Sequence, residues 1–346
     1  MTRLELLQDE LERPLLVSAW ASVRYLCGLS SSNTALVIER ERARLFTDSR
    51  YTAAARRVSE IEVVEVARDV FSSLGSLIDG EIAFAPEDLT VAEFEKLKAG
   101  GLSLQPLADD PVLRMRARKD PEELDAVRHA ASITNAAYSQ LASEPFRGRS
   151  ESELAWRMAE LFHELGADGE AFPTIVATGP NGALPHAEPG ERVVKAGDLV
   201  VVDAGAHVDG YCADCTRTFA AGEPSDELRR AYEVCLAAQE TGLAALATGT
   251  LAREVDAAAR SVVEASEFAG HFRHGLGHGV GIDVHEAPWL STEAGETRLE
   301  SGNVVTVEPG IYLEDVGGIR IEDLVIVGAH GIEVLTTTSK QLRRVG

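Results

Sequence analysis

The chain has 346 residues, of which 45% are hydrophobic and 26% are charged, and its formal net charge is −23. This length is sufficient for two domains with hydrophobic cores of ordinary size. The acidic balance argues against nucleic acid or an anionic membrane surface as a partner, because both are bound through basic patches.

The sequence carries no recognisable signal for export or membrane insertion. Residues 1–20 lack a basic start followed by an apolar core, and no apolar run approaches transmembrane length. We therefore expect a cytoplasmic protein. The cysteines are too few for a disulfide framework; they are Cys27, Cys212, Cys215 and Cys235.

Residues 1–115 are predicted to form a small α/β domain. Thr90 and Glu93 have the spacing of a capping box and begin a helix. A charged stretch follows, after which Asp120 and Pro121 begin a second, longer helix, so the domain boundary is placed near residue 115. The strands of this domain are predicted at residues 15–19, 34–38, 44–47, 62–66 and 82–85.

Residues 116–346 are predicted to form a larger α+β domain. Apolar residues at helical spacing predict helices over residues 120–141, 150–165, 225–246 and 250–266. Strands are predicted over residues 174–178, 304–312, 318–327 and 332–336, together with a hairpin at 198–218. Long helices set against antiparallel strands favour this class over a doubly wound parallel sheet.

The hairpin contains two carboxylates that are unexpected in a buried strand. Asp203 follows the β-branched run 199–202, and Asp214 lies on the returning strand. Asp209 and Gly210 are a turn signal, and folding the hairpin about Val208 and Asp209 would place the two acids opposite or nearly opposite each other. Close buried carboxylates repel one another and lose hydration unless a proton or a cation lies between them. A metal ion is the simplest resolution.

Further donors occur downstream. Glu308 and Glu322 each interrupt a β-branched pattern, and His278 lies among glycines that suit a backbone passing close to a ligand. Any one of these acids alone is more often a solvent-facing strand residue or an ion-pair partner. Four such acids and a glycine-flanked histidine in one domain make that interpretation improbable.

Two other interpretations of the glycine-rich stretch fail. His274 and His278 have the spacing of a zincin pair, but Gly275 stands where the catalytic glutamate of a zincin would be. A dinucleotide-binding fingerprint would need glycine at Val280.

The predicted donors indicate a reaction class. Four carboxylates and one imidazole suit Mn, Co or Zn, and two divalent cations would balance the charge. Such a pair lowers the pKa of water and polarises a carbonyl group, which indicates metal-assisted hydrolysis.

The ordered series of Asp203, Asp214, His278, Glu308 and Glu322 resembles the pita-bread metallopeptidases, family M24, which include methionine aminopeptidase, prolidase, aminopeptidase P and creatinase. The resemblance covers essentially the whole chain, and residues 24–26 and 45–51 resemble the creatinase-type N-terminal domain. It implies a pita-bread catalytic domain with an antiparallel sheet and helices. The other matching segments are residues 118–124, 184–187, 211–218 and 308–312.

The resemblance also implies residue roles. Asp203 would hold one metal ion, His278 and Glu308 the other, and Asp214 and Glu322 both. Glu308 would also accept the proton of the attacking water, and His285 is the candidate donor to the developing oxyanion. The residues implied in substrate binding are His186, His274, Tyr312 and Arg320. Without the resemblance, His186 could simply cap a turn, Tyr312 could be a core residue and Arg320 could pair with an acid.

Within this family the sequence most resembles a bacterial Xaa-Pro peptidase that uses two divalent ions, Mn above Co or Zn. Its short N-terminal domain favours Xaa-Pro dipeptidase over aminopeptidase P, which acts on longer peptides, and the family resemblance implies a homodimer. Methionine aminopeptidase does not need this N-terminal domain, and creatinase works without metals. The departures at Ser22, Cys27 and Leu29 bear on substrate details only.

Two rivals come from other classes. One is a non-catalytic binding module on the same fold, although such relatives have typically lost ligands that this chain retains. The other is a thiol-redox protein that uses Cys212 and Cys215. Strand alternation places Cys212 on the face of Asp214 and Cys215 on the opposite face, and we interpret both as small apolar fillers.

Overall fold

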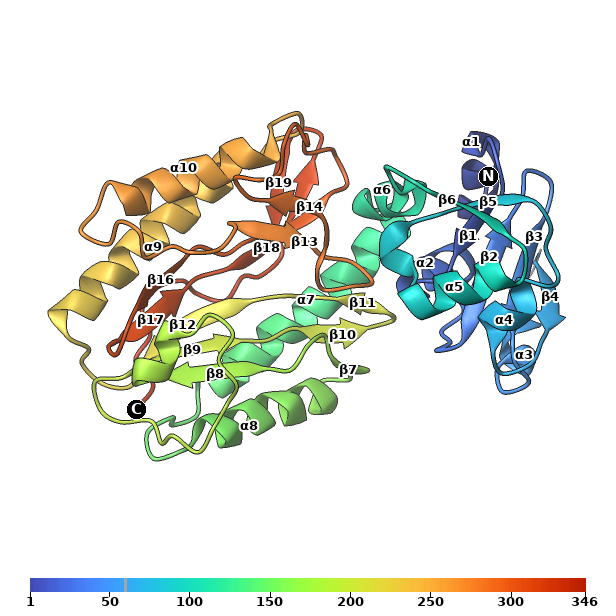
Figure 1. Ribbon diagram of the computed structural model, residues 1–346. Coiled ribbons are helices and arrows are strands. Elements are labelled where there is room, and N and C mark those ends of the chain that lie inside the picture. Colours follow the sequence, from blue (N-terminus) through green and yellow to red (C-terminus); the bar gives the residue numbers. More distant parts are fainter. Residues whose placement is uncertain (59–60) are drawn as a thin grey trace. The chain divides into compact units, whose positions relative to one another are not determined.

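The computed structural model describes residues 1–58 and 61–346. The chain divides into two compact units, Met1–Arg116 and Ala117–Gly346 (Figure 1). In the part of the chain that the structure describes, no helix is both long and apolar enough to cross a lipid bilayer.

The first unit is built on a mixed six-stranded sheet with the order β4-β3-β2-β1-β5-β6. The central strands β1, β2 and β3 pair antiparallel, whereas β3–β4, β1–β5 and β5–β6 are parallel. The five predicted strands are present, and β6 was missed because it is short, lacks β-branched residues and ends in proline. The strands are β1 (Leu15–Val17), β2 (Thr34–Ile38), β3 (Ala43–Thr47), β4 (Glu62–Glu65), β5 (Glu81–Phe84) and β6 (Ser103–Pro106).

Short helices connect these strands. The predicted capping box at Thr90 and Glu93 is confirmed, with both reciprocal hydrogen bonds present at the start of α5. The hydrophobic core lies between sheet and helices and includes Phe46, Leu74 and Leu97. The helices are α1 (Arg3–Glu10), α2 (Trp20–Cys27), α3 (Thr52–Ala55), α4 (Val70–Leu74), α5 (Val91–Ala99) and α6 (Pro111–Ala117), with a 3-10 turn η1 (Pro86–Asp88).

The second unit contains the four long helices that the sequence predicts. Asp120 and Ser150 cap two of them with complete capping boxes, and Ser225 caps a third. The helices α7 and α8 pack on one set of strands and α9 and α10 on another, each around its own hydrophobic core (Figure 1). Their bounds are α7 (Pro121–Leu141), α8 (Glu151–Glu164), α9 (Asp226–Ala245) and α10 (Ala252–Glu264).

The strands of the second unit pair antiparallel, as an α+β catalytic domain requires. They form sheets with the orders β11-β10-β7, β12-β9-β8, β14-β13-β15-β18-β19 and β16-β17. Their bounds are β7 (Gly169–Glu170), β8 (Ile175–Thr178), β9 (Leu199–Asp203), β10 (Ala206–Val208), β11 (Tyr211–Cys212), β12 (Thr216–Ala220), β13 (Gly277–Gly279), β14 (Glu286–Leu290), β15 (Val304–Val307), β16 (Gly310–Leu313), β17 (Gly317–Arg320), β18 (Asp323–Gly328) and β19 (Gly331–Val334), with a 3-10 helix η2 (Gly179–Ala183).

The hairpin at residues 198–218 is present and its Asp209-Gly210 turn signal is confirmed, but the register assumed from a fold about Val208 and Asp209 is wrong by one position. The turn lies at Asp209 and Gly210, not at Val208 and Asp209, and both turn residues have positive φ, as an Asp-Gly turn allows. This shift places Thr216, not Asp214, opposite Asp203.

The first hairpin is interrupted beside its second acid. β9 pairs with β12 and β10 pairs with β11, and Asp214 lies between β11 and β12. A Cβ atom at Gly205, between β9 and β10, would fall 1.7 Å from the carbonyl oxygen of Ala213. The backbone segments can approach this closely only because residue 205 is glycine.

The second hairpin is interrupted in the same way. The stretches 304–312 and 318–327 were predicted as continuous strands, but Glu308 separates β15 from β16 and Glu322 separates β17 from β18. The ladder pairs Val307 with Asp323 and Gly310 with Arg320, so the two glutamates lie across from each other in this register. Each strand passes here from one sheet to another, a change of direction that hydrophobic periodicity does not reveal.

Candidate metal centre

The five predicted metal ligands come from strand ends, strand breaks and one short central strand. Asp203 ends β9, Asp214 precedes β12, and His278 is the middle residue of β13. Glu308 and Glu322 occupy the breaks of the second hairpin. We call these five residues the acidic cage.

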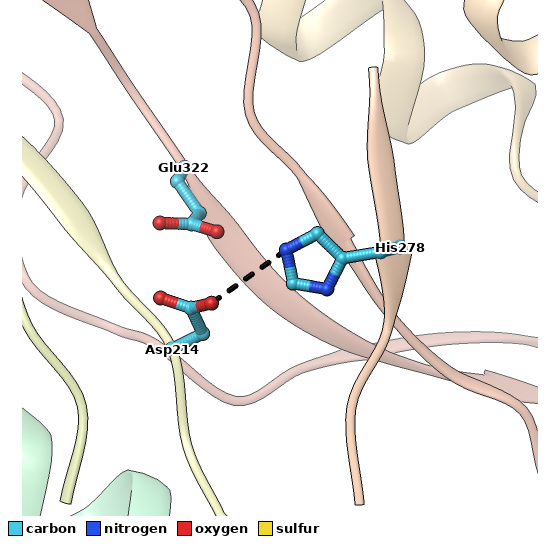
Figure 2. A group of neighbouring side chains, drawn as sticks. All are labelled: Asp214, His278 and Glu322. Atoms are coloured by element: carbon cyan, nitrogen blue, oxygen red, sulfur yellow. Dashed lines mark ion pairs between the residues drawn. The ribbon is translucent and has the colours of Figure 1, made fainter. Parts of the chain in front are cut away.

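Three members of the cage converge on one point (Figure 2). The ligand atoms of Asp214, His278 and Glu322 all lie within 4.8 Å of one another, and all three residues are buried. His278 Nε2 is 3.7 Å from Asp214 Oδ2. Residues far apart in the sequence are thus brought to a single site.

Glu308 joins the same group through His278. Its Oε1 atom lies 3.1 Å from His278 Nε2 and accepts a hydrogen bond of 3.2 Å from the Thr306 hydroxyl. The same threonine oxygen accepts the backbone N–H of His278 at 3.1 Å. Thr306 therefore fixes the separation of these two cage members.

Asp203 is held by a chain of polar groups that contains three of the predicted substrate-binding residues. Arg320 Nη2 donates to Asp203 Oδ2 at 2.7 Å, and Arg320 Nη1 donates to the Tyr312 hydroxyl at 3.0 Å. His274 Nε2 lies 2.9 Å from that hydroxyl. Burial raises the pKa of Tyr312 to about 12, so the phenol stays protonated and can donate to His274.

The carboxylates of the cage repel one another in a site that is shielded from water. Burial, followed by the charge of Glu322, raises the pKa of Asp214 well above its ordinary value. Burial and the charge of Glu308 do the same to the pKa of Glu322. For Glu308, burial acts in that direction but is outweighed by the hydrogen bond and charge of His278, so its pKa falls to about 2. Such a cluster requires protons or cations.

Two buried carboxylate oxygens without hydrogen-bond partners among the described residues indicate that the cage fits divalent cations. Within residues 1–58 and 61–346, Asp203 Oδ1 and Asp214 Oδ1 are buried with no hydrogen-bond partner. A buried carboxylate oxygen without a donor is costly, and a hard cation supplies the missing interaction. The donor set of carboxylates and one imidazole suits Mn, Co or Zn.

The remaining predicted residues lie around the cage with different exposure. The ring of His285 packs edge-on against that of His278 with centroids 4.4 Å apart, and burial together with the His278 charge lowers the His285 pKa. His186 is exposed, on the segment after η2, whose Pro185 carbonyl accepts a 2.9 Å hydrogen bond from Arg320. His285 and His186 are the more accessible of the predicted substrate contacts.

Sequence reasoning missed the threonines that hold the cage. Thr216 donates to Glu322 Oε2 at 2.7 Å and accepts from Arg320 Nε at 3.1 Å. Thr306 has the equivalent role for Glu308. Each threonine lies two positions from a predicted ligand, a spacing that could have identified it.

Cys212 and Cys215 are buried packing residues, as predicted, but the faces that strand alternation assigned to them are wrong. Asp214 lies outside the strands, so alternation does not assign Cys212 to its face; Cys212 and Cys215 instead share one hydrophobic core. Burial raises the pKa of Cys212 to about 12 and also raises that of Cys215. Both thiols are free and packed in the interior.

Comparisons with known proteins agree with this geometry. Residues 125–329 match metallopeptidase family M24, and residues 3–117 match the creatinase/prolidase N-terminal domain. The chain belongs to metallopeptidase family M24. Its resemblance to the prolidase and aminopeptidase P branch is confirmed, as is the two-part fold with a pita-bread catalytic domain.

Among its M24 relatives are proteins of both proline-specific activities. The Xaa-Pro dipeptidase of Pyrococcus furiosus is 32% identical over 89% of this chain and 88% of its own. A structure of an Xaa-Pro dipeptidase from Bacillus anthracis superposes with a TM-score of 0.91 at 34% identity, covering 99% of this chain and 98% of that one. A structure of an X-Pro aminopeptidase from Thermotoga maritima MSB8 superposes with a TM-score of 0.84 at 35% identity, covering 96% of this chain and 97% of that one. The length of the N-terminal domain therefore does not separate the two activities.

Proposed function

We propose that this M24 enzyme hydrolyses the peptide bond that precedes proline, with Xaa-Pro dipeptides as its favoured substrates. One observation carries the proposal: the ligand atoms of Asp214, His278 and Glu322 converge within 4.8 Å. They do so in a chain that is similar over nearly its whole length to proteins named Xaa-Pro dipeptidase.

The cage would hold two divalent metal ions, with manganese as the favoured metal. Asp203 is assigned to one ion, His278 and Glu308 to the other, and Asp214 and Glu322 to both. The unpartnered oxygen atoms of Asp203 and Asp214 support this assignment. The bound ions would polarise the scissile carbonyl and lower the pKa of water, the chemistry that peptide hydrolysis needs.

Glu308 is the proposed proton acceptor for the attacking water. A carboxylate is ionised at neutral pH and can receive a proton, and Glu308 Oε1 lies within the cage, 3.1 Å from His278 Nε2. His285 is the proposed donor to the developing oxyanion, and its exposed position beside His278 leaves its ring open to a substrate.

His186, His274, Tyr312 and Arg320 are the proposed substrate-orienting residues. Tyr312 and Arg320 are buried and hydrogen-bonded to each other. We therefore assign them mainly to orienting His274 and Asp203, with little direct contact to the peptide. His186 is exposed on its loop and is assigned to the peptide itself.

A paired assay tests the substrate. The metal-stripped protein is supplied with Mn²⁺ and given an Xaa-Pro dipeptide and an Xaa-Pro-Xaa tripeptide of the same first residue. The dipeptide should be cleaved much faster. Comparable cleavage of the tripeptide would replace the dipeptidase by the alternative, an Xaa-Pro aminopeptidase. Binding of metal without cleavage of either peptide would contradict proline-specific hydrolysis and favour a binding module.

Metal removal separates hydrolysis from thiol chemistry. A chelator should abolish activity, and Mn²⁺ should restore it. Cys215→Ala should leave most of the activity, since the Cys215 thiol is buried and its pKa is raised. Activity that survives chelation but disappears with the cysteine would support the thiol-redox rival.

The remaining parts of the proposal concern organisation. We assign residues 1–115 to the creatinase-type N-terminal domain and residues 116–346 to the catalytic domain. We also propose a cytoplasmic homodimer that acts on small peptides. Size-exclusion chromatography with light scattering would test the dimer, which predicts twice the 37.1 kDa chain mass.

A further inference from the structure

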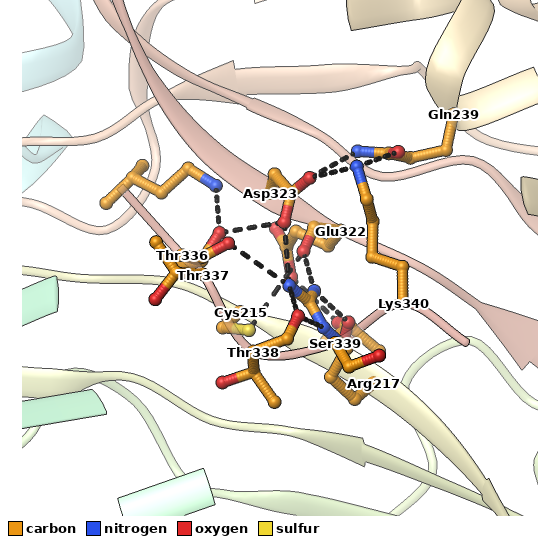
Figure 3. Close-up of polar contacts among 12 residues, drawn as sticks. Cys215, Arg217, Gln239, Glu322, Asp323, Thr336, Thr337, Thr338, Ser339 and Lys340 are labelled. Carbon is orange, nitrogen blue, oxygen red and sulfur yellow. Dashed lines mark hydrogen bonds and ion pairs between the residues drawn. The ribbon is translucent and has the colours of Figure 1, made fainter. Parts of the chain in front are cut away.

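A second buried polar cluster adjoins the acidic cage at Glu322 (Figure 3). It contains Arg217, Gln239, Asp323 and Lys340, together with backbone groups of the segment 336–338. Arg217 is 2% exposed and Asp323 is 0% exposed. We call this group the Arg217 clamp.

Arg217 uses every nitrogen of its guanidinium group. Nε donates to the Thr338 carbonyl at 3.0 Å, and Nη2 donates to Asp323 Oδ1 at 2.7 Å and to the Thr336 and Thr338 carbonyls at 3.3 and 2.8 Å. Nη1 donates to the Thr216 carbonyl at 2.9 Å and also to the Glu322 carbonyl. One side chain thereby joins three separate segments of backbone.

Asp323 is equally well satisfied. Its Oδ1 atom accepts from Arg217 and, at 3.0 Å, from the Thr336 hydroxyl. Its Oδ2 atom accepts from Gln239 Nε2 at 2.9 Å and from Lys340 Nζ at 2.7 Å. A buried charge with this many donors is rigidly held.

The clamp meets the cage at two points. Thr216 and Glu322, whose carbonyls both accept from Arg217, also bond to each other: the Thr216 hydroxyl donates to Glu322 Oε2 at 2.7 Å, and the Glu322 N–H donates to the Thr216 carbonyl at 3.1 Å. Thr216 is two residues from Asp214, and Asp323 follows Glu322 in the chain. Arg217 thus connects the two backbone segments that carry Asp214 and Glu322.

We propose that Arg217 and Asp323 are a positioning pair that sets the separation of Asp214 and Glu322, and therefore the spacing at which the cage binds its two metal ions. The inference rests on the proposed function only in requiring that the cage hold metal. Arg217 reaches Glu322 through the backbone and acts through the carboxylates, not on the substrate.

The geometry of Arg217 explains why lysine cannot replace it. A guanidinium group presents five N–H donors in a fixed planar fork, whereas an ammonium group presents three on a flexible stem. Lysine at position 217 would keep the charge opposite Asp323 but could not join the Thr216, Glu322 and Thr338 carbonyls at once. Arg217→Lys therefore tests the fork separately from the ion pair.

Lys340 links the clamp to the C-terminal segment. Its side chain is 24% exposed, and its amine contacts both Asp323 and the Gln239 side-chain oxygen. Lys340→Met removes this contact while Arg217 stays bonded to Asp323. Lys340→Met should therefore weaken metal binding by the cage less than Arg217→Lys does.

Cobalt(II) binding tests the proposal without relying on activity. The metal-stripped full chain is titrated with Co²⁺ by calorimetry, and the visible spectrum of the bound ions is recorded. Loss of an outer contact to a metal ligand typically weakens binding by about 10- to 100-fold. Arg217→Lys should weaken at least one Co²⁺ site by about that factor and change the visible band. Lys340→Met should give a smaller change in the same direction.

Arg128→Lys is the matched control. Arg128 forms an exposed pair with Glu333 at 2.7 Å, on the same unit but outside the cage. This variant should bind Co²⁺ as the unmodified chain does. Co²⁺ constants and a spectrum that are unchanged in both clamp variants would overturn the positioning role, even if Arg217→Lys unfolds at a lower temperature. If the unmodified chain does not hydrolyse Xaa-Pro peptides while the clamp variants still show the predicted cobalt changes, the proposed substrate is contradicted and the clamp is supported.

Discussion

Glu322 and Asp323 are adjacent in the sequence and both are buried, and each accepts a threonine hydroxyl, yet only the Asp323 carboxyl group is bonded to basic side chains. Asp323 meets Arg217, Lys340 and two neutral donors; burial raises its pKa, but these cations outweigh burial and lower it. Burial and the charge of Glu308 raise the pKa of Glu322 well above its ordinary value. A buried acid with resident cations stabilises the fold, whereas a buried acid without them is prepared for a cation from solution.

The largest expected effect is on activity, when an acid of the cage rather than of the Arg217 clamp is neutralised. Asp214→Asn keeps the shape of the side chain but removes a charge assigned to both metal ions. We expect kcat/KM on an Xaa-Pro dipeptide to fall by at least about 10³-fold, since bound metal contributes several kcal/mol to such a reaction.

The same substitution should leave the metal-free protein at least as stable. The raised pKa of Asp214 means that its ionised form is disfavoured in the folded state. Thermal unfolding in a chelator would measure this. A large loss of metal-free stability in Asp214→Asn would show that the acid supports the fold and would end the contrast with Asp323.

Asp323→Asn should have the opposite signature. It leaves Arg217 and Lys340 without their buried counter-charge, which costs about 3 kcal/mol of the free energy of unfolding. Because the folded-state pKa of Asp323 is lowered, the native contribution is present above the unfolded pKa of this group and is lost as the pH falls through the folded value.

Urea unfolding of the metal-free chain at several pH values, with and without Asp323→Asn, checks both points. The variant should lack this part of the acid-induced loss of stability. Equal stability of the two proteins at neutral pH would mean that Asp323 is not the counter-charge of the clamp.

Thr216→Val should produce an intermediate effect on metal binding. The substitution removes the hydroxyl that donates to Glu322, at nearly constant volume. We expect metal affinity to fall by about 10- to 100-fold. Thr241→Val is the control, because the Thr241 hydroxyl donates to the Ala237 carbonyl of its own helix at 2.7 Å, outside the cage. Similar Mn²⁺ affinities in the two variants would exclude a role for Thr216 in the cage.

The smallest expected effect is on stability and concerns Asp88 in the first unit, a third, partly buried acid. Burial and the nearby charge of Asp110 raise its pKa to about 6. The folded state therefore binds a proton more tightly than the unfolded chain, and this contribution to stability is present below the unfolded pKa and disappears as the pH rises through about 6.

Asp88→Asn should flatten the dependence of stability on pH in this window, by roughly 1 kcal/mol between pH 4 and 7 after allowance for partial solvent contact. Denaturant unfolding across that range measures it. An unchanged pH profile would mean that Asp88 is not protonated in the folded state.

Much of the fold could be predicted because its signals are local. Capping boxes at Thr90, Asp120 and Ser150 mark helix starts, and β-branched runs mark the buried strands. Single acids inside such runs identified candidates for the cage, since a charge in a buried strand needs an explanation.

The rest depends on how distant segments pair. The sequence could not reveal that the strands break at Glu308 and Glu322, because a change of sheet leaves the hydrophobic period intact. It also could not pair Arg217 with Asp323, since 106 positions separate the two residues. The one-position error at the Asp209 turn likewise hid the role of Thr216.

Calorimetric titration of the metal-stripped chain with Mn²⁺, alongside the Xaa-Pro dipeptide assay on the same samples, tests most directly whether the acidic cage is a two-metal hydrolytic centre. We predict two Mn²⁺ ions per chain, loss of this stoichiometry in Asp214→Asn, and dipeptide cleavage that appears only as the ions bind. A chain that cleaves the dipeptide at full rate while metal-free, or that still binds two ions with unchanged affinity in Asp214→Asn, would contradict it.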